Sequence, residues 1–190
     1  LQRGISAMIH YHGMPITPNS AAVRAVGGGH AFVCCAHPEQ LGIVLEVCQS
    51  FAVDNGAFPA WRSGSPVTSW KPYYGWVQEL HRYPQFDFAV IPDVIDGDEA
   101  ANDALIDEWP WKDKPWIGAP VWHMHESLDR LLRLALAFPR ICIGSSGEYA
   151  DVGSQRWCTR IAEAMNTICD RDWRPIFKIH GLRMLDVEIF

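Results

Sequence analysis

Short apolar runs alternate with amphipathic segments along most of the chain. The runs end in turn-forming or polar residues, a pattern that is typical of buried strands. They predict strands at residues 7–11, 31–35, 51–53, 87–91, 116–121, 140–143 and 175–179. Apolar residues at helical spacing predict helices at residues 20–26, 39–49, 73–83, 98–108, 126–138 and 155–170. This alternation predicts parallel strands joined by crossover helices.

Two α/β architectures fit this order of elements, an open doubly wound sheet and a (β/α)8 barrel. No GxGxxG motif follows the first predicted strand, which disfavours a dinucleotide-binding sheet. We therefore expect one TIM-barrel-like domain over residues 1–190. We expect it to be incomplete at the C-terminal (eighth) strand, because residues 184–190 are only an unfinished tail and a complete barrel usually needs ~250 residues. The chain begins with Leu1 rather than Met, so we expect a fragment.

Composition narrows the classes of partner and the compartment. The formal net charge of −6 argues against a large unspecific nucleic-acid surface, although it leaves a local basic groove open. The six cysteines form no CxxC pair and have no zinc-finger spacing, so we expect free thiols in a reducing, cytoplasmic compartment. No apolar run approaches the ~20 residues that span a bilayer, so we expect no membrane partner. The oligomeric state is left open.

Polar side chains follow almost every predicted strand. The set comprises His10, His12, His37, Asp54, Asn55, Asp93, His123, His125, Ser145, Ser146, Glu148 and His180. In a barrel the carboxyl ends of the strands converge on one face, where active sites are built. Each of these residues alone is commonly a cap or a turn residue, but their joint occurrence favours a functional pocket.

One chemistry for this set is metal-dependent hydrolysis. His10 and His12 form an HxH pair, and His123, His180 and Asp54 could complete the ligands of a metal ion that activates water. No carboxylate or lysine bridges two metals at a clear spacing.

The other chemistry uses carboxylates and backbone amides, without a metal or a cofactor. An ionised carboxylate only accepts hydrogen bonds, so Asp54 and Asp93 suit the N–H groups of a purine-like base. The glycines of GSSG at residues 144–147 would let a flat ring approach the backbone closely. Phe58 or Trp122 could stack on the base.

These residues carry a resemblance to a known family. VDNGAF at residues 53–58 resembles the D-S-G-G-F segment of tRNA-guanine transglycosylases, and the later blocks follow in the same order. They are IPDV at 91–94, similar to the strand with the base-binding Asp; IGAPVWHMHESLDRLL at 117–132, similar to the F-G-I-V-Q-G-G block; ICIGSSGEYA at 141–150, similar to the Gly-rich base-recognition strand; and KIHGLRM at 178–184, similar to the segment before the last barrel strand. The chain most resembles the compact transglycosylase-like proteins of phages and bacterial genomic islands, which are associated with 7-deazaguanine bases in DNA.

The resemblance implies a (β/α)8 barrel that exchanges guanine or a 7-deazaguanine at a nucleic-acid glycosidic bond, with DNA favoured over tRNA as the polymer. It implies that Asp54 is catalytic, orienting the base or transferring a proton, and that Asp93 recognises the base edge. The other expected base-contacting residues are Asn55, Gly56, Phe58, Trp122, His123, Gly144, Ser145, Ser146, Glu148, Lys178 and His180. No metal and no cofactor is expected.

The chain departs from the family pattern at several positions. Val121 stands where the family has a base-binding Gln, and Trp122 and His123 replace the two glycines that follow, so His123 is the candidate replacement. The family's nucleophilic Asp lies on the last strand, which falls beyond Phe190, and Asp186 comes too early to substitute for it. The Cys-rich zinc subdomain of the tRNA enzymes is also missing from this sequence. A non-catalytic nucleic-acid-binding subunit therefore stays open as an alternative.

Overall fold

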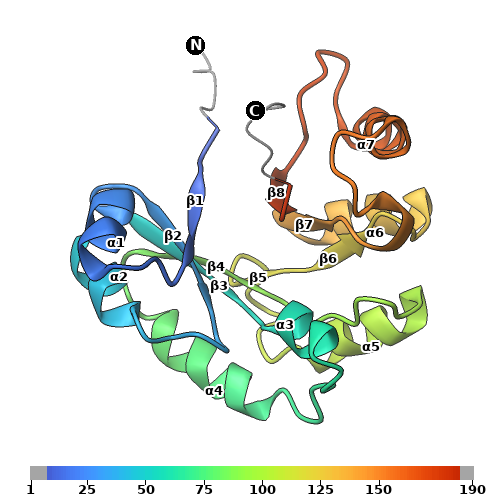
Figure 1. Ribbon diagram of the computed structural model, residues 1–190. Coiled ribbons are helices and arrows are strands. Elements are labelled where there is room, and N and C mark those ends of the chain that lie inside the picture. Colours follow the sequence, from blue (N-terminus) through green and yellow to red (C-terminus); the bar gives the residue numbers. More distant parts are fainter. Residues whose placement is uncertain (1–7, 185–190) are drawn as a thin grey trace.

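The computed structural model describes residues 8–184 of the chain. The first half contains β1 (Tyr11–Met14), α1 (Asn19–Val26), β2 (His30–Cys34), α2 (Leu41–Val47), β3 (Ser50–Asp54), α3 (Ala57–Arg62), α4 (Lys71–Leu80) and β4 (Phe86–Val90). The second half contains α5 (Glu99–Glu108), β5 (Gly118–Ala119), β6 (Val121–His123), α6 (Leu128–Ala137), β7 (Arg140–Gly144), the 3-10 helix η1 (Gly147–Tyr149), α7 (Gln155–Ile168) and β8 (Lys178–Leu182). The strands lie in the middle and most helices lie around them (Figure 1).

All strand pairs are parallel and fall into two sheets. One sheet has the order β1-β2-β3-β4-β5, and the other has the order β6-β7-β8. Pro120 separates β5 from β6, and it has no N–H with which to continue a ladder. At Pro120 the chain changes its pairing partner from the β4 side to β7. Ala119 O accepts from Ile91 N–H, just after β4, at 2.9 Å, and Pro120 O accepts from Cys142 N–H of β7 at 2.8 Å. Among the described residues no strand pairing joins β1 to β8.

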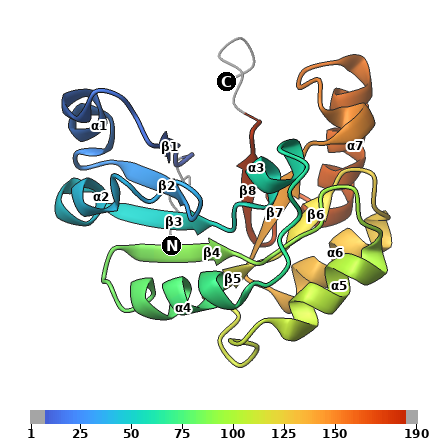
Figure 2. The ribbon, with the colours of Figure 1, turned by 60° about the horizontal axis from the view of Figure 1, so that its bottom comes forward.

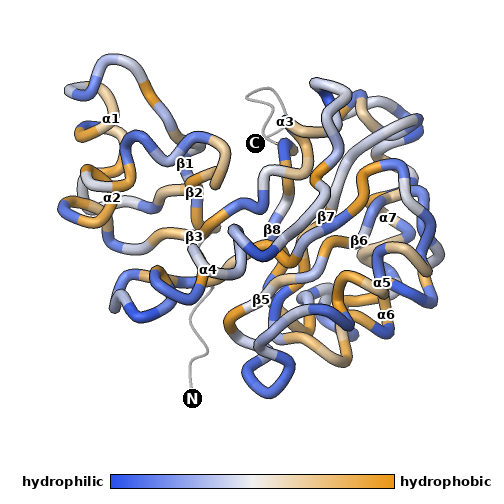
Figure 3. Tube along the Cα trace, turned by 90° about the horizontal axis from the view of Figure 1, so that it is seen from below, coloured by the Kyte–Doolittle hydropathy of each residue, from blue (hydrophilic) through white to orange (hydrophobic). Residues whose placement is uncertain are grey.

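The strands bury apolar side chains on both faces, as parallel sheets with crossover helices do. On the outer face, β2 and β3 pack against α1, α2 and α4, and β6 and β7 pack against α6 and α7 (Figure 2). On the opposite face, which we call the inner face, a separate cluster is formed by Ala52, Phe88, Val90, Ala119, Val121 and Cys142, with Tyr11, Phe32 and Leu182 at its edge. Hydrophobic residues accordingly gather along the strands, while the outer loops are largely hydrophilic (Figure 3).

Three helices begin at the hydroxyl or carboxylate caps that the sequence favours. The side chains of Asp98, Ser127 and Ser154 accept hydrogen bonds from backbone N–H groups in the first turns of α5, α6 and α7. Among residues 8–184, no helix combines the length and the apolar composition that a membrane crossing requires.

Two predicted strands lie several residues before the observed ones. The first was expected at residues 7–11, but Met8 and Ile9 are 78% and 51% exposed, and pairing with β2 begins at Tyr11. The last was expected at residues 175–179, but pairing with β7 runs from Lys178 to Leu182. In both cases the pairing partner, rather than the apolar run, decides where the strand lies. The helix α3 was not predicted, and the expected strand at 116–121 is divided at Pro120.

Candidate functional site

Buried polar residues meet where β3, β4 and β6 end. Asn55 follows β3 directly, Asp93 lies three residues beyond β4, and His123 is the last residue of β6. The Asn55 side-chain amide donates to Asp93 Oδ1 at 2.8 Å and to Ile91 O at 3.0 Å. On the other side of the carboxylate, Asp93 Oδ2 lies 3.0 Å from His123 Nε2. Asn55, Asp93 and His123 are all buried, so one carboxylate is held between an amide and an imidazole.

A second buried layer fixes the backbone of His123. The His123 N–H donates to Glu126 Oε2 at 2.9 Å, and the same oxygen accepts from Arg130 Nη1 at 2.5 Å. Glu126 Oε1 accepts from Asn102 Nδ2 at 3.0 Å, and Arg130 Nη1 also donates to Val121 O at 2.9 Å. Arg130 Nε also pairs with Asp103 Oδ1 at 3.0 Å, while Arg130 Nη2 has no hydrogen-bond partner among the described residues. Because a buried ion pair is costly unless further hydrogen bonds accompany it, these contacts favour one arrangement of the turn after β6.

The imidazole of His123 is positioned by packing more than by hydrogen bonds. Within residues 8–184 neither ring nitrogen has a hydrogen-bond partner of good alignment, although Nε2 is close to Asp93. The ring lies against Gly144 at the end of β7, where an added Cβ would be 2.9 Å from Nδ1. Gly144 therefore lets the ring approach the backbone of β7.

Two buried serines, Ser145 and Ser146, follow Gly144 in the chain. Ser145 Oγ donates to the Tyr149 carbonyl, whereas Ser146 Oγ has no hydrogen-bond partner among the residues that the structure describes. A buried hydroxyl without a partner is unusual, and this one is a ready donor or acceptor beside the site.

Asp54 is a carboxylate of the site whose pKa is raised. It ends β3, is half-buried, and pairs in register with Cys34 of β2. Burial raises the pKa of Asp54 to about 6, and the Asp93 carboxylate acts in the same direction, while the Cys34 thiol and the N–H groups of Gly56 and Asn55 oppose the shift. A carboxyl group that titrates in this range can both give and take a proton near neutral pH.

Phe58 and Arg183 form one wall of the site. Gly56 adopts a left-handed conformation (φ 77°) that turns the chain from β3 into α3, which places Phe58 next to the strand ends. Arg183 follows β8, and its Cζ lies 3.3 Å from the centroid of the Phe58 ring. Its Nη2 donates to Ser145 O at 3.4 Å. Burial lowers the pKa of Arg183, and the carboxylates of Asp54 and Asp93 oppose this change.

A cavity of about 390 Å³ adjoins the site on the side of α3 and α4. Asn55, Gly56, Cys35 and Tyr73 contribute to its lining. The Cys35 thiol donates to Asn55 O at 2.9 Å, so this wall is coupled to the residue that holds Asp93. The volume is that of a pocket for a small ligand.

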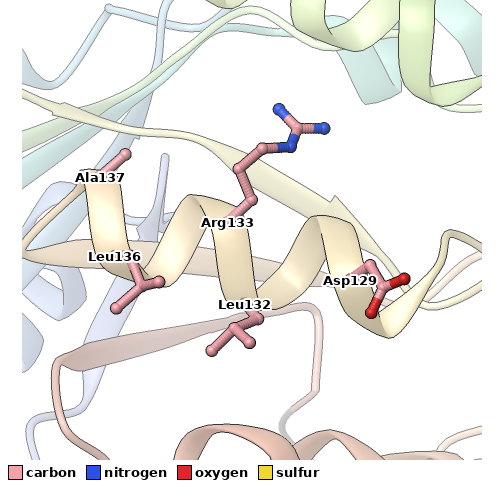
Figure 4. A pocket seen from close by; sticks show the side chains of 5 residues that line it. All are labelled: Asp129, Leu132, Arg133, Leu136 and Ala137. Carbon is pink, nitrogen blue, oxygen red and sulfur yellow. The ribbon is translucent and has the colours of Figure 1, made fainter.

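A second hollow, of about 420 Å³, lies on the exposed surface of α6 and contains none of the candidate residues. Its lining is Asp129, Leu132, Arg133, Leu136 and Ala137 (Figure 4).

Comparison with protein-family models, with curated proteins and with solved structures finds no match to this chain.

The structure brings together most of the predicted site residues. Those gathered at the carboxyl ends of the strands or on α3 are Asp54, Asn55, Gly56, Phe58, Asp93, His123, Gly144, Ser145 and Ser146. Their ligand contacts stay predictions.

Trp122 and Glu148 do not face this site. Trp122 is fully buried against α6 and α7, and its Nε1 donates to Ser127 O at 3.0 Å. Successive residues of a strand point to opposite faces, so His123 and Trp122 cannot both point inward. Glu148 is exposed on η1 and pairs with Arg156 at 2.8 Å.

Lys178 and His180 were expected at a strand end but lie earlier in β8. Lys178 is exposed and pairs in register with Arg140 at the amino end of β7. His180 packs between the rings of Tyr11 and Phe32 on the inner face, at 5.5 and 4.9 Å, and burial lowers its pKa to about 4. Because β8 ends three residues later than expected, Arg183 occupies the position after the strand at which His180 was predicted.

The remaining histidines lie outside the site. His10 and His12 stack on each other at 4.4 Å, before and within β1 rather than after it. His37 is exposed near Glu39, and exposed His125 has its Nε2 3.2 Å from Gly97 O.

The metal-hydrolase hypothesis needs His10, His12, His123 and His180 in one place. Among residues 8–184 no group of three or more His, Cys, Asp or Glu side chains is arranged to hold a metal ion. The histidine set on which the hypothesis depends is therefore not assembled. Asp186, considered as a nucleophile, lies outside the described residues.

Proposed function

We propose that the chain binds guanine or a 7-deazaguanine at a nucleic-acid glycosidic bond and takes part in exchange of that base. The observation that carries the proposal is the joining of Asn55, Asp93 and His123 from three strand ends, at 2.8 and 3.0 Å, beside Asp54 at the end of β3. The ring of Phe58 is linked to these strand ends by Arg183, which contacts both Phe58 and Ser145. These residues support the proposal because they offer hydrogen-bond acceptors for a base edge and an aromatic ring for stacking.

In this proposal the protein recognises the base edge through carboxylate oxygens that accept hydrogen bonds. Guanine presents an N–H and an adjacent exocyclic amine, and each carboxylate oxygen can accept more than one hydrogen bond. Asp93 is oriented by Asn55 and keeps acceptor capacity for the base edge. Asp54 is less buried than Asp93 and offers a second acceptor. The ring of Phe58 supplies the stacking surface.

Exchange also requires a proton carrier. The glycosidic bond to one base breaks and a bond to another forms, so the leaving base gains a proton at its ring nitrogen and the entering base loses one. Asp54, with a pKa of about 6, can receive that proton from the entering base and deliver it to the leaving base. We assign Asp54 this role.

The proposal includes a barrel architecture and a cytoplasmic location. The rings of Tyr11 on β1 and His180 on β8 lie 5.5 Å apart, so the first and last described strands approach each other as they would in a (β/α)8-like barrel. The free cysteines fit a reducing compartment.

Calorimetric titration with guanine and 7-deazaguanine tests the proposal, with adenine as the ligand control because its ring nitrogen at the same edge is an acceptor. The wild type should bind the first two bases. The isosteric change Asp93→Asn should weaken binding by about tenfold or more, since it replaces an acceptor by an amide and removes a charged hydrogen bond. Asp107→Ala, at an 85% exposed side chain on α5, is the matched control and should bind like the wild type.

Binding of adenine equal to that of guanine, or no base binding by the wild type, would contradict the proposal. Binding of DNA without any base would instead support the non-catalytic subunit. Incorporation of labelled guanine into DNA, lost in Asp54→Asn while base binding persists, would separate proton transfer from recognition.

A further inference from the structure

The guanidinium of Arg183 lies in the part of the site that the proposed function gives to the base. Its Cζ is 3.3 Å from the centroid of the Phe58 ring, which is the stacking distance of a planar group. Its Nη2 donates to the carbonyl of Ser145 at 3.4 Å. Both Asp54 and Asp93 act on this cation electrostatically. Arg183 thus contacts the ring on which a bound base would stack and a backbone acceptor at the end of β7.

A guanidinium and the recognition edge of guanine share their chemistry. Both are planar, and both present N–H donors on an N–C–N unit that matches a carboxylate in two parallel hydrogen bonds. Both also stack on an aromatic face. A seat made of Phe58 and acidic side chains therefore fits either group, but not both at once.

Resting on the proposed function, we propose that Arg183 is a built-in competitor for the base seat, which its own guanidinium occupies until a base with a guanidine-like edge displaces it. The seat is then selective for planar ligands with an N–C–N donor edge. The apparent affinity for the base is reduced by the fraction of molecules in which Arg183 fills the seat.

The surroundings of the guanidinium argue against a phosphate-binding role in this position. The guanidinium contacts the Ser145 carbonyl, and the carboxylates of Asp54 and Asp93 act on it electrostatically from a greater distance, so that all three groups would repel an anion. One face of the guanidinium plane is covered by the Phe58 ring. A phosphate could reach Arg183 only after the side chain had left this seat.

The test compares wild type, Arg183→Ala and Arg183→Lys by calorimetry with two probes, guanine and methylguanidinium. Arg183→Ala should bind guanine about tenfold more tightly than the wild type, because the cation–π contact no longer competes. It should also bind methylguanidinium, which should compete with guanine, whereas the wild type should bind methylguanidinium only weakly. Arg183→Lys keeps the charge but not the planar group, and its affinity for guanine should lie between the two.

The two probes distinguish failure of this inference from failure of the proposed function. Guanine binding that is unchanged or weaker in Arg183→Ala would overturn the inference and leave the proposed function standing. Methylguanidinium binding by Arg183→Ala without guanine binding by any variant would support the seat and refute the base-binding function. If Arg183→Ala bound neither probe, the inference would be wrong, and circular dichroism would show whether the variant is folded.

Discussion

Replacing Gly144 by alanine should disturb the site through one contact. The added Cβ would lie 2.9 Å from His123 Nδ1 and 3.2 Å from Val121 Cγ1, both closer than side chains normally pack. The His123 ring cannot simply move away, because its Nε2 is already 3.0 Å from Asp93 Oδ2. Overpacking of a buried site costs about 1–3 kcal/mol, so we expect the free energy of unfolding to fall by about 2 kcal/mol.

Urea unfolding followed by circular dichroism measures this effect. With a slope of about 2 kcal/mol per molar urea, a loss of about 2 kcal/mol moves the midpoint down by about 1 M. Gly75→Ala is the matched control: Gly75 lies within α4, an added Cβ there meets nothing within 4 Å apart from its chain neighbours and the backbone of its own helix, and the change should stabilise the protein by about 0.5–1 kcal/mol. The same two variants should differ in guanine affinity, which only Gly144→Ala should reduce.

A double-mutant cycle tests whether the contact with His123 causes the predicted loss of stability. In a His123→Ala background the ring that meets the new methyl group is gone, so Gly144→Ala should cost less there than in the wild type. An equal cost in both backgrounds, or a Gly144→Ala variant as stable as Gly75→Ala, would refute the argument that Gly144 exists to admit the His123 ring.

Three further predictions concern the neighbouring groups. Folding raises the pKa of Asp54 from 3.8 to about 6, so the folded state binds the proton more strongly than the unfolded state. The contribution of Asp54 to stability therefore falls as pH rises from about 4 to 6. In thermal unfolding, Asp54→Asn should be more stable than the wild type at pH 7.5, and this difference should shrink below pH 4. Glu126→Ala should lower the free energy of unfolding by about 3 kcal/mol, since it leaves buried Arg130 with only Asp103 as an ion-pair partner and removes the acceptor of the His123 N–H and the Asn102 amide, whereas Glu163→Ala on the surface of α7 should change it by less than about 1 kcal/mol. Alkylation of Cys35 by iodoacetamide should weaken guanine binding, because the Cys35 thiol donates to Asn55 O and Asn55 holds Asp93, whereas Cys35→Ser should be unaffected by the reagent. Full binding by alkylated wild type, with the modified residue identified by mass spectrometry, would contradict this coupling.

The alternation of apolar runs and helical segments was sufficient to predict parallel strands with crossover helices. It also placed Asp54, Asn55, Asp93 and His123 at strand ends, because each of these follows a run whose residues are buried in the sheet. For such runs the local pattern and the tertiary environment agree, so the end of the apolar run is close to the end of the strand.

The hydrophobic pattern gave the wrong strand bounds where pairing with a neighbouring strand determines the position of the strand. In β8 the exposed Lys178 and the half-buried His180 are held by register with β7, which no local pattern reveals, and the error of three residues concealed Arg183. The outward orientation of Trp122 could have been predicted from the sequence, because adjacent residues of a strand point to opposite faces and His123 was expected to point to the site. The spacing of Glu126 and Arg130 is that of an i, i+4 ion pair, but only the fold shows that the pair is buried under His123.

The two ends of the inner face differ in how their charges are satisfied, and this difference favours a site at the carboxyl ends. At the amino ends Asp87 accepts from both terminal nitrogens of Arg140, at 2.7 and 3.0 Å, and also from the Tyr11 hydroxyl. Although burial acts in the opposite direction, these hydrogen bonds hold the pKa of Asp87 below its usual value, as in a structural ion pair.

At the carboxyl ends the corresponding groups are less completely paired. The pKa of Asp54 is raised, the His123 ring has no well-aligned partner among the described residues, and Arg183 rests on an aromatic ring rather than in a bidentate pair. Groups whose charges are only partly compensated within the fold can gain more from a ligand than groups that are already saturated. A ligand that binds at the carboxyl ends would therefore add hydrogen bonds, whereas one at the amino ends would first have to break the Asp87–Arg140 pair.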